Sequence, residues 1–200
     1  MRTIEVPPFI KGLIFDCDGT LVDSMPLHMK AWEHVITSRG GLWDFEFFFS
    51  KKGMPEEEIV VLYNAHFARA FDPVDTVHDK HKFFRAHASE FRPIPFVVDV
   101  VLKYSGILPM AIASGGVREN VDLELDALHI KKYFQAVVTA DDAVQPKPAP
   151  DIFLEAARRI GVAPEYCQVF EDGDLGLEAA RIAGMLPTDV RRGEGTLHIL

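Results

Sequence analysis

The sequence predicts an α/β protein, with a doubly wound, Rossmann-like parallel sheet and an inserted small α-helical cap domain. Short apolar runs alternate with longer amphipathic stretches over much of the chain, and one segment offers helical periods without a convincing strand. The length of 200 residues and the hydrophobic content of 48% suit one substantial domain with a smaller satellite. We therefore expect a core of residues 1–23 and 93–200 and a cap of residues 24–92.

The expected strands are the short apolar runs of the core. Their alternation with amphipathic stretches is typical of a parallel sheet covered by helices. The five candidates are Gly12 to Phe15, Met110 to Ala113, Ala136 to Thr139, Gln168 to Phe170 and a weaker Thr188 to Val190.

Two core helices have clear start and stop signals. Pro150 suits the first turn of one helix, and Gly161 suits its end. Asp174 suits the N-cap of the other, which we expect to end at Gly184. The expected buried stripe of this second helix consists of Leu175, Ala179, Ile182 and Ala183.

The cap is expected to be helical throughout. Ser24 before Met25-Pro26 is a start signal for a helix that runs to about Arg39. Two more helices are expected over residues 55–70 and 73–91, and the Arg92-Pro93-Ile94-Pro95 stretch is typical of a stiff return connection.

The charge and cysteine content narrow the classes of partner. The chain has 21 basic and 30 acidic residues and a formal charge of −9, which argues against a nucleic-acid surface. Cys17 and Cys167 offer no disulfide framework and suit a reducing compartment. No apolar run approaches the ~20 residues that span a bilayer, so we expect a cytoplasmic protein without a membrane partner. Nothing in the sequence indicates the oligomeric state.

Polar side chains follow several of the predicted strands. Asp16 and Asp18 follow the first strand, the Ser114-Gly115-Gly116 turn follows the second, and Glu171-Asp172 follows the fourth. Lys147 lies in the loop after the third strand, between two prolines. Because ligands of open parallel sheets bind at the carboxyl ends of the strands, these groups should converge on one edge.

The electrostatics of that edge favour a metal ion and a phosphate group. Four ionised carboxylates carry about −4, which is unfavourable unless a cation joins them or one keeps its proton. All-oxygen ligands favour Mg²⁺, which shares phosphate oxygens readily. Lys147 adds a further positive charge. We therefore expect a small phosphorylated metabolite as the substrate.

The paired aspartates suit phosphoryl transfer. Asp16 can attack phosphorus and form an aspartyl-phosphate, while Asp18 protonates the leaving alkoxide and later deprotonates water. Thr20 and Ser114 can donate hydroxyl hydrogen bonds to the phosphoryl oxygens, and exposed amides of the turn at Gly115 can form an anion nest. Aspartate and glycine are also ordinary turn residues, so the DCDGT stretch alone would be a weak signal.

Four motifs in order resemble those of the haloacid-dehalogenase superfamily. They are FDCDGTLVDS, ASGG (Ala113 to Gly116), KPAPD (Lys147 to Asp151) and FEDGDLGLEAARIAGM (Phe170 to Met185). The chain resembles the helical-cap branch that contains β-phosphoglucomutases and sugar-phosphate phosphatases, and its motifs are most similar to those of fructose-1-phosphate phosphatases. The resemblance covers nearly the full chain.

The resemblance implies roles for individual residues. Asp16 would be the nucleophile and Asp18 the general acid/base, with Ser114 and Lys147 on the phosphate. Mg²⁺ would be held by Asp16, the main-chain carbonyl of Asp18, Asp172 and Glu171. The overall expectation is a Mg²⁺-dependent sugar-phosphate phosphatase.

Three alternative functions can be compared with the sequence. A dehalogenase would need no metal-binding carboxylate set, and Asp18, Glu171 and Asp172 speak against it. A β-phosphoglucomutase-type mutase needs a cap cation for a distal phosphate. In mutases an arginine follows a Lys-Gly pair, whereas Lys52-Gly53 precedes Met-Pro and three glutamates. Cations that could substitute are Arg69, Lys80, Lys82 and Arg85. The third alternative is a catalytically silent regulatory protein on the same fold. Such a protein could lose catalytic residues, whereas all the expected chemical groups are present in this sequence.

The cap should select the leaving group of the substrate. Lys52 and Gly53 are candidate substrate-binding residues. His28 is expected to contact substrate, as the resembling branch implies, with a packed structural histidine as the alternative because Ala31 and Trp32 follow one turn later. The other cap histidines at positions 66, 78, 81 and 87 are expected on the cap surface, and Cys17 in the core.

Overall fold

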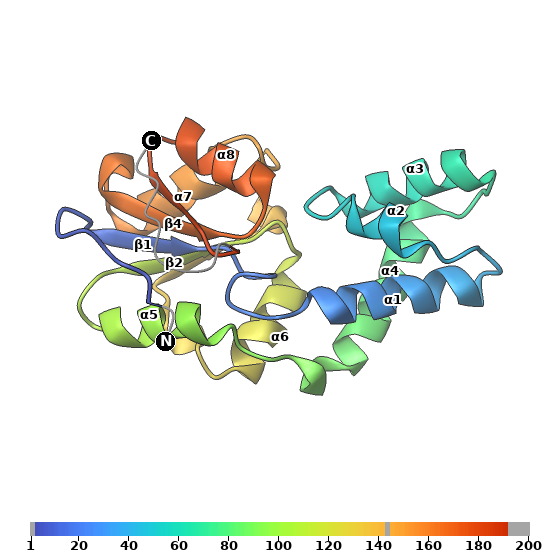
Figure 1. The fold of residues 1–200 in the computed structure, drawn as a ribbon, viewed down its shortest axis with the longest axis horizontal. Helices are drawn as coiled ribbons and strands as arrows, with labels where there is room; N and C mark the ends of the chain where they lie inside the picture. Colours follow the sequence, from blue (N-terminus) through green and yellow to red (C-terminus); the bar gives the residue numbers. More distant parts are fainter. Residues whose placement is uncertain (1–2, 143–144, 192–200) are drawn as a thin grey trace. The chain divides into compact units, whose positions relative to one another are not determined.

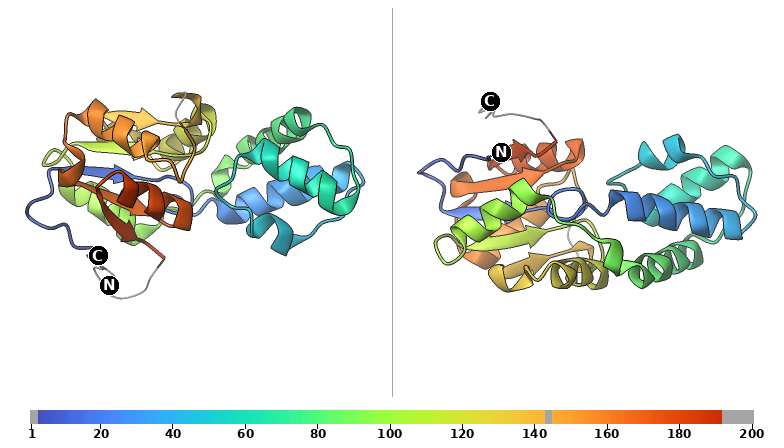
Figure 2. Two further views of the ribbon diagram at one scale, coloured as in Figure 1. Left: turned by 90° about the horizontal axis from the view of Figure 1, so that it is seen from above. Right: turned by 60° about the horizontal axis from the view of Figure 1, so that its bottom comes forward.

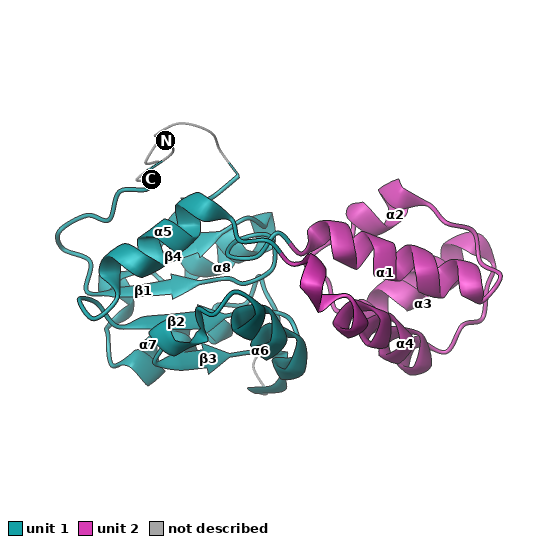
Figure 3. Cartoon of the chain, turned by 90° about the horizontal axis from the view of Figure 1, so that it is seen from below, with its two compact units in different colours: residues 1–23, 92–200 teal, residues 24–91 magenta. Residues whose placement is uncertain are grey.

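The structure is a computed structural model that describes residues 3–142 and 145–191. Within the described chain, contacts define two compact units (Figure 3). The first contains residues 1–23 and 92–200, and the second contains residues 24–91. Arg92, which was predicted to lie in the cap, belongs to the first unit. Most of the C-terminal tail, residues 192–200, lies outside the described residues.

The first unit is built on a parallel sheet of five strands, which confirms the predicted fold class (Figure 1). The strands are β1 (Gly12–Phe15), β2 (Met110–Ala113), β3 (Ala136–Val138), β4 (Cys167–Glu171) and β5 (Leu186–Asp189). Their spatial order is β3-β2-β1-β4-β5, so the winding direction reverses at β1. Register pairs Phe15 with Ile112 on one side and with Phe170 on the other, which brings the ends of β1, β2 and β4 together.

Helices cover both faces of this sheet. The described residues of the first unit form the helices α5 (Pro95–Tyr104), α6 (Arg118–Ala127), α7 (Asp151–Ile160) and α8 (Asp174–Ile182). Short 3-10 turns occupy Lys131–Tyr133, Ala140–Asp142 and Pro164–Tyr166 in this unit and Ala88–Glu90 in the second. The α7 helix packs on β1, β2 and β3, and α8 packs on β4 and β5. The views agree that α5 and α6 lie on the opposite face (Figures 1 and 2).

The strands are buried because both of their faces meet helices. Every residue of β1, β2 and β4 is buried. Between the sheet and the α7 and α8 helices lies an apolar core whose members include Ile14, Ala111, Val138, Phe153, Val169 and Ala180. Burial of each aliphatic side chain stabilises the folded state by about 1.5–3 kcal/mol, which is why strands buried on both faces consist of short, continuous apolar runs.

The second unit is a helical cap with its own core. Its helices are α1 (Met25–Ser38), α2 (Phe45–Phe49), α3 (Glu56–Phe67) and α4 (Pro73–Ala86). The core is rich in aromatic side chains and includes Trp32, Val35, Phe48, Tyr63 and Val77. Stacked rings such as Trp32 on Phe48, with centroids 5.0 Å apart, join α1 to α2.

Several predicted details differ from the structure. Asp174 is the first residue of α8 rather than its cap; Gly173 occupies the N-cap position. Asp174 instead accepts a hydrogen bond from Arg191 at 2.7 Å. Leu175 and Ile182 are 39% and 55% exposed, so the expected buried stripe was half wrong. The helices α5 and α6 were not predicted. The apolar residues of α5 directly follow Pro95, and those of α6 alternate with acidic residues, so neither stretch was recognised as a helix.

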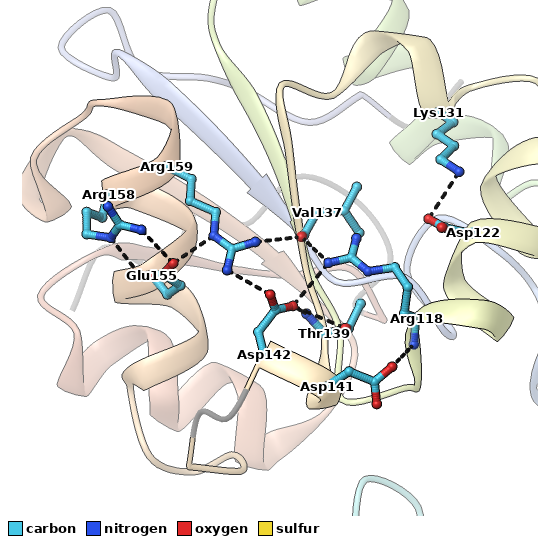
Figure 4. Close-up of polar contacts among 10 residues, drawn as sticks. All are labelled: Arg118, Asp122, Lys131, Val137, Thr139, Asp141, Asp142, Glu155, Arg158 and Arg159. Atoms are coloured by element: carbon cyan, nitrogen blue, oxygen red, sulfur yellow. Dashed lines mark hydrogen bonds and ion pairs between the residues drawn. The ribbon is translucent and has the colours of Figure 1, made fainter.

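A network of charged side chains ties the end of β3 to two helices (Figure 4). Asp142 accepts hydrogen bonds from Arg118 at 3.1 Å and from Arg159 at 2.7 Å. Both arginines also donate to the carbonyl of Val137, and the Thr139 amide donates to Asp142 at 2.8 Å. The network therefore anchors the segment that leads, five residues later, to Lys147.

Among the residues that the structure describes, none of the helices combines the length and the apolarity needed to cross a membrane.

Candidate active site

The carboxyl ends of three neighbouring strands carry the predicted site residues of the core. Asp16 follows β1 directly, Ser114 follows β2, and Glu171 is the last residue of β4. The reversal of winding at β1 opens the usual ligand position of a doubly wound sheet. The expected convergence on one edge therefore has a topological basis.

Lys147 joins two of these carboxylates. Its Nζ donates to Asp16 Oδ1 over 2.7 Å and to Glu171 Oε2 over 2.7 Å. The three side chains are only 11%, 8% and 4% exposed, respectively. A charge-assisted pair in such a setting is short and strong because little water screens it. Lys147 thus neutralises part of the negative charge at the strand ends.

Titration of these groups reflects their burial. Burial raises the pKa of Asp16 to about 6, although the Lys147 ammonium opposes that shift. Burial and the Asp16 charge raise the pKa of Glu171 to about 7. Burial lowers the pKa of Lys147, but Asp16 and Glu171 outweigh it and hold that pKa above its ordinary value. The site therefore holds more negative charge than one lysine can balance.

A third carboxylate completes the cluster. Carboxylate oxygens of Asp16, Glu171 and Asp172 lie within 4.8 Å of one another. Hard carboxylate oxygens are the donors that Mg²⁺ and similar divalent cations prefer. This donor set fits a divalent metal ion.

The turn after β1 is shaped to approach Asp172. Gly19 has a φ of +74°, and a Cβ atom there would lie 2.6 Å from Asp172 Oδ2. Only glycine fits both the backbone conformation and the space. The buried Thr20 hydroxyl donates to Asp172 Oδ1 at 3.4 Å. The expected phosphate ligand Thr20 therefore orients a carboxylate in this structure.

The α8 helix leaves room for the Glu171 side chain because it has a glycine, Gly176, next to it. A Cβ on Gly176 would lie 2.1 Å from Glu171 Oε2. The Gly173 amide donates to Glu171 Oε1 at 2.8 Å. The Glu171 carboxylate is thereby fixed between the start of α8 and Lys147.

The turn after β2 is also held in place. The Ser114 amide donates to Val138 on the neighbouring strand, and the Gly116 amide donates to Ser114 Oγ at 3.1 Å. Ser114 is buried, whereas Gly115 is exposed. The open space around a Cβ on Gly115 leaves its backbone accessible.

The three predicted substrate-binding residues of the cap belong to the second unit. The His28 ring stacks on Phe84 at 4.2 Å, and its Nδ1 lies 2.6 Å from Lys80 Nζ. Lys52 Nζ lies 5.3 Å from the centre of the Phe49 ring, and Gly53 has a φ of +83°. These contacts are those expected of a packed structural histidine. Contact of His28 with substrate stays a prediction.

Sequence reasoning missed a charged cluster in the cap. Lys80 is fully buried and forms an ion pair with Glu56, which also contacts His81 at 2.5 Å. Burial raises the pKa of Glu56, but Lys80 and His81 outweigh it and hold that pKa well below its ordinary value. His81 is only 13% exposed, so its expected surface position was wrong. The helical spacing of Val77, Lys80 and Phe84 on one buried face was the available signal.

A second missed residue lies beside the first motif. Glu124 of α6 is fully buried and accepts a hydrogen bond from the Cys17 thiol at 3.1 Å. Burial and the Glu124 carboxylate raise the pKa of the Cys17 thiol well above its ordinary value, so it stays a thiol at neutral pH. Cys17 is a buried core residue, as predicted, but with a polar partner.

Comparison with known proteins identifies the family. The sequence matches the haloacid dehalogenase-like hydrolases over residues 10–184, which is most of the chain. The chain is a member of this family and a hydrolase. The predicted superfamily is thereby confirmed. Hydrolases of this family generally use a divalent metal ion, and the acidic cluster of this one is able to hold such an ion.

Individual relatives agree with this assignment. The hydrolase is 40% identical to the fructose-1-phosphate phosphatase YqaB of Escherichia coli, covering 90% of this chain and 96% of that protein. It is 29% identical to the β-phosphoglucomutase of Bacillus subtilis, covering 94% and 86% of the two chains. It is also similar to CbbY from Rhodobacter sphaeroides, crystallised with xylulose-(1,5)bisphosphate, with a TM-score of 0.81 and 25% identity over 89% of this chain and 84% of that one.

Proposed function

We propose that this hydrolase is a Mg²⁺-dependent sugar-phosphate phosphatase that cleaves a small, fructose-1-phosphate-like monoester through an aspartyl-phosphate. The observation that carries the proposal is the placement of Lys147 at 2.7 Å from both Asp16 and Glu171, at the carboxyl edge of the sheet. The 40% identity to a fructose-1-phosphate phosphatase supports the substrate class.

Four residues would hold the metal ion. They are Asp16, Glu171 and Asp172 through carboxylates and Asp18 through its main-chain carbonyl. When bound, Mg²⁺ neutralises negative charge on the carboxylates and on the phosphoryl oxygens. The close spacing of the three carboxylates supports this assignment.

The reaction is a double displacement at phosphorus. An Asp16 oxygen attacks, the bond between phosphorus and the ester oxygen breaks, and Asp18 gives its proton to the departing alkoxide. In the second half, Asp18 takes a proton from water, which attacks the aspartyl-phosphate and releases inorganic phosphate. Each half returns Asp18 to the protonation state that the other half needs.

The other predicted site residues of the first unit would bind the phosphate group. Lys147 provides the cation, Ser114 its hydroxyl, and Gly115 an exposed backbone amide. Thr20 is the weakest member of this set. Its hydroxyl has one proton, which it already donates to Asp172, so a bond to a phosphoryl oxygen would replace that contact.

The cap residues His28, Lys52 and Gly53 are proposed to select the leaving group. Phosphatase activity is favoured over a β-phosphoglucomutase-type reaction because Glu56 pairs with Lys80, one of the cap cations that could otherwise hold a distal phosphate. A mutase needs a cap cation that is free to hold a distal phosphate. A small phosphorylated metabolite is therefore the proposed partner.

A silent regulatory protein on this fold would have no use for the full set of chemical groups. Asp16, Asp18, Lys147 and Asp172 are all present, which supports catalysis. The presence of two free, buried cysteines supports the reducing environment of the cytoplasm as the location.

The decisive experiment measures phosphate release from an aryl phosphate with and without Mg²⁺. We expect Mg²⁺-dependent turnover that Asp16→Asn abolishes. Absence of turnover in the wild type, or equal turnover in the variant, would contradict the proposed phosphatase mechanism with Asp16 as nucleophile. A panel of hexose, pentose and two-carbon phosphates, with and without a sugar bisphosphate, then identifies the substrate. An isomeric product formed only with the bisphosphate would favour the mutase.

A further inference from the structure

Glu124 is a buried acid that the proposed mechanism does not use. It lies on α6, at a position with no exposed surface, next to the apolar Val121 and Leu125. An ionisable side chain in such a place is costly unless its polar atoms have partners. Its Oε2 accepts the hydrogen bond of the Cys17 thiol at 3.1 Å, which fixes one end of the carboxyl group.

The Glu124 carboxyl group also lies near Asp18. Carboxylate oxygens of Glu124 and Asp18 lie within 4.8 Å of each other. Glu124 Oε1 is buried and accepts no hydrogen bond among the described residues. Asp18 is a polar neighbour of the Glu124 carboxyl group. Cys17, Glu124 and Asp18 form a chain of contacts from the core to the proposed acid/base.

We propose that Glu124 is a positioning residue that holds the Asp18 carboxyl in the direction needed for proton transfer. This inference rests on the proposed phosphatase function, in which Asp18 protonates the leaving group. Asp18 is only partly buried and directly precedes the turn at Gly19 and Thr20, and an aspartate side chain has several staggered rotamers unless its neighbours restrict them. A fixed neighbour on a helix restricts those rotamers, and misplacement of a catalytic group is costly to the rate.

Comparing substrates with different leaving groups distinguishes a positioning role of Glu124 from a purely structural one, because only a positioning role should affect the two substrates unequally. A sugar alkoxide is a poor leaving group and needs a proton from Asp18, whereas a nitrophenolate leaves readily without one. Loss of Asp18 positioning should therefore slow the first chemical step for fructose 1-phosphate and spare it for p-nitrophenyl phosphate. The first-turnover burst of nitrophenol isolates that step, because it precedes the water attack that also needs Asp18.

The test compares two variants of similar size. Glu124→Met removes the polar contact and keeps the volume, and Glu124→Gln keeps the shape and supplies amide donors. We expect Glu124→Met to lower kcat for fructose 1-phosphate about 10- to 100-fold, within the usual contribution of acid/base catalysis, with KM little changed. The nitrophenol burst rate should fall less than threefold. Glu124→Gln should regain most of the lost rate.

Three outcomes would overturn the inference. They are equal losses on both substrates, no loss on either, and a Glu124→Gln variant as impaired as Glu124→Met. If Glu124→Met fails to fold, Cys17→Ala removes the donor that holds Glu124 and should produce a smaller loss confined to the sugar phosphate; a uniform loss would count against the proposal. Failure of the phosphatase proposal is distinguishable, since the wild type itself would then release no phosphate.

Discussion

The Lys147 ammonium donates to Asp16 Oδ1 over 2.7 Å and so joins residues that are 131 positions apart in the sequence. Both side chains are nearly buried, and Lys147 makes an equally short contact with Glu171. One cation thus faces two carboxylates in a poorly hydrated setting.

Replacing Lys147 with Met should abolish most of the activity. The substitution removes the proposed phosphate cation and leaves the carboxylates of Asp16 and Glu171 without their shared partner. We expect kcat/KM to fall at least about a hundredfold, as for the removal of a strong electrostatic stabiliser of the transition state. Lys11→Met is the matched control, because Lys11 is exposed and lies over the Tyr166 ring. Comparable losses in both variants would contradict the assigned role.

Mg²⁺ binding should weaken as the pH falls. Without metal, the pKa values of Asp16 and Glu171 lie near 6 and 7, so a cation must displace protons from them below neutrality. We expect the Mg²⁺ concentration for half-maximal activity to rise between pH 8 and pH 5.5. A concentration that stays constant over this range would argue against metal binding at these carboxylates.

The same carboxylates determine how stability responds to pH. Their folded pKa values exceed the ordinary ones, so the metal-free protein should lose stability as pH rises from about 4 through 7. Added Mg²⁺ binds the ionised form, and its stabilising effect should therefore grow over the same range. Thermal unfolding at several pH values, with and without Mg²⁺, measures how stability changes with pH and how much Mg²⁺ adds to it. The dependence should diminish in Asp16→Asn.

Replacing Glu56 with Gln should destabilise the cap. The substitution leaves the fully buried Lys80 ammonium without its anionic partner, which costs on the order of 3 kcal/mol. The folded pKa of Glu56 lies below its ordinary value of 4.5, so its contribution is present above that pH and is lost as pH falls further. Wild type and variant should thus converge in stability at low pH. Glu57→Gln, at an exposed neighbour, should have little effect in denaturant unfolding.

Replacing Asp142 with Asn should loosen the end of β3. Burial raises the pKa of Asp142, but hydrogen bonds from Arg159 and the Thr139 amide outweigh it and hold the pKa below its ordinary value. Loss of charge-assisted hydrogen bonds to two arginines that are about a third exposed should cost about 1–2 kcal/mol. Asp126→Asn, which affects an exposed pair with Lys131, serves as the control. Equal unfolding free energies in the two variants would contradict the anchoring role of Asp142.

Some of the site was predictable because strand ends are local features. The GLIF and MAIA runs match β1 and β2 residue for residue, and the apolar pattern alone places Asp16 and Ser114 at their carboxyl ends. Lys147 stood out by its position in a motif between two prolines. Parallel pairing then brings these ends to one edge, since neighbouring strands in register share their direction.

Side-chain partners were harder to predict. Glu124 and Lys80 are charged residues at core-facing positions of helices, where local pattern predicts apolar side chains. Their presence is explained only by partners distant in the sequence, Cys17 for Glu124 and Glu56 for Lys80. The exposed Leu175 and Ile182 of α8 are the converse case, because an apolar residue on a helix does not reveal which face meets the sheet.

The sheet, the family and the identity of the chemical groups could be predicted from consecutive residues, because the hydrophobic period and the strand-end motifs are local features. Which charges meet depends on the folded chain. The tertiary structure set Lys147 between Asp16 and Glu171, turned the Thr20 hydroxyl toward Asp172, and buried Glu124 against the first motif. Such contacts depend on the packing of segments far apart in the chain, and the free energy of a buried charge depends on that packing.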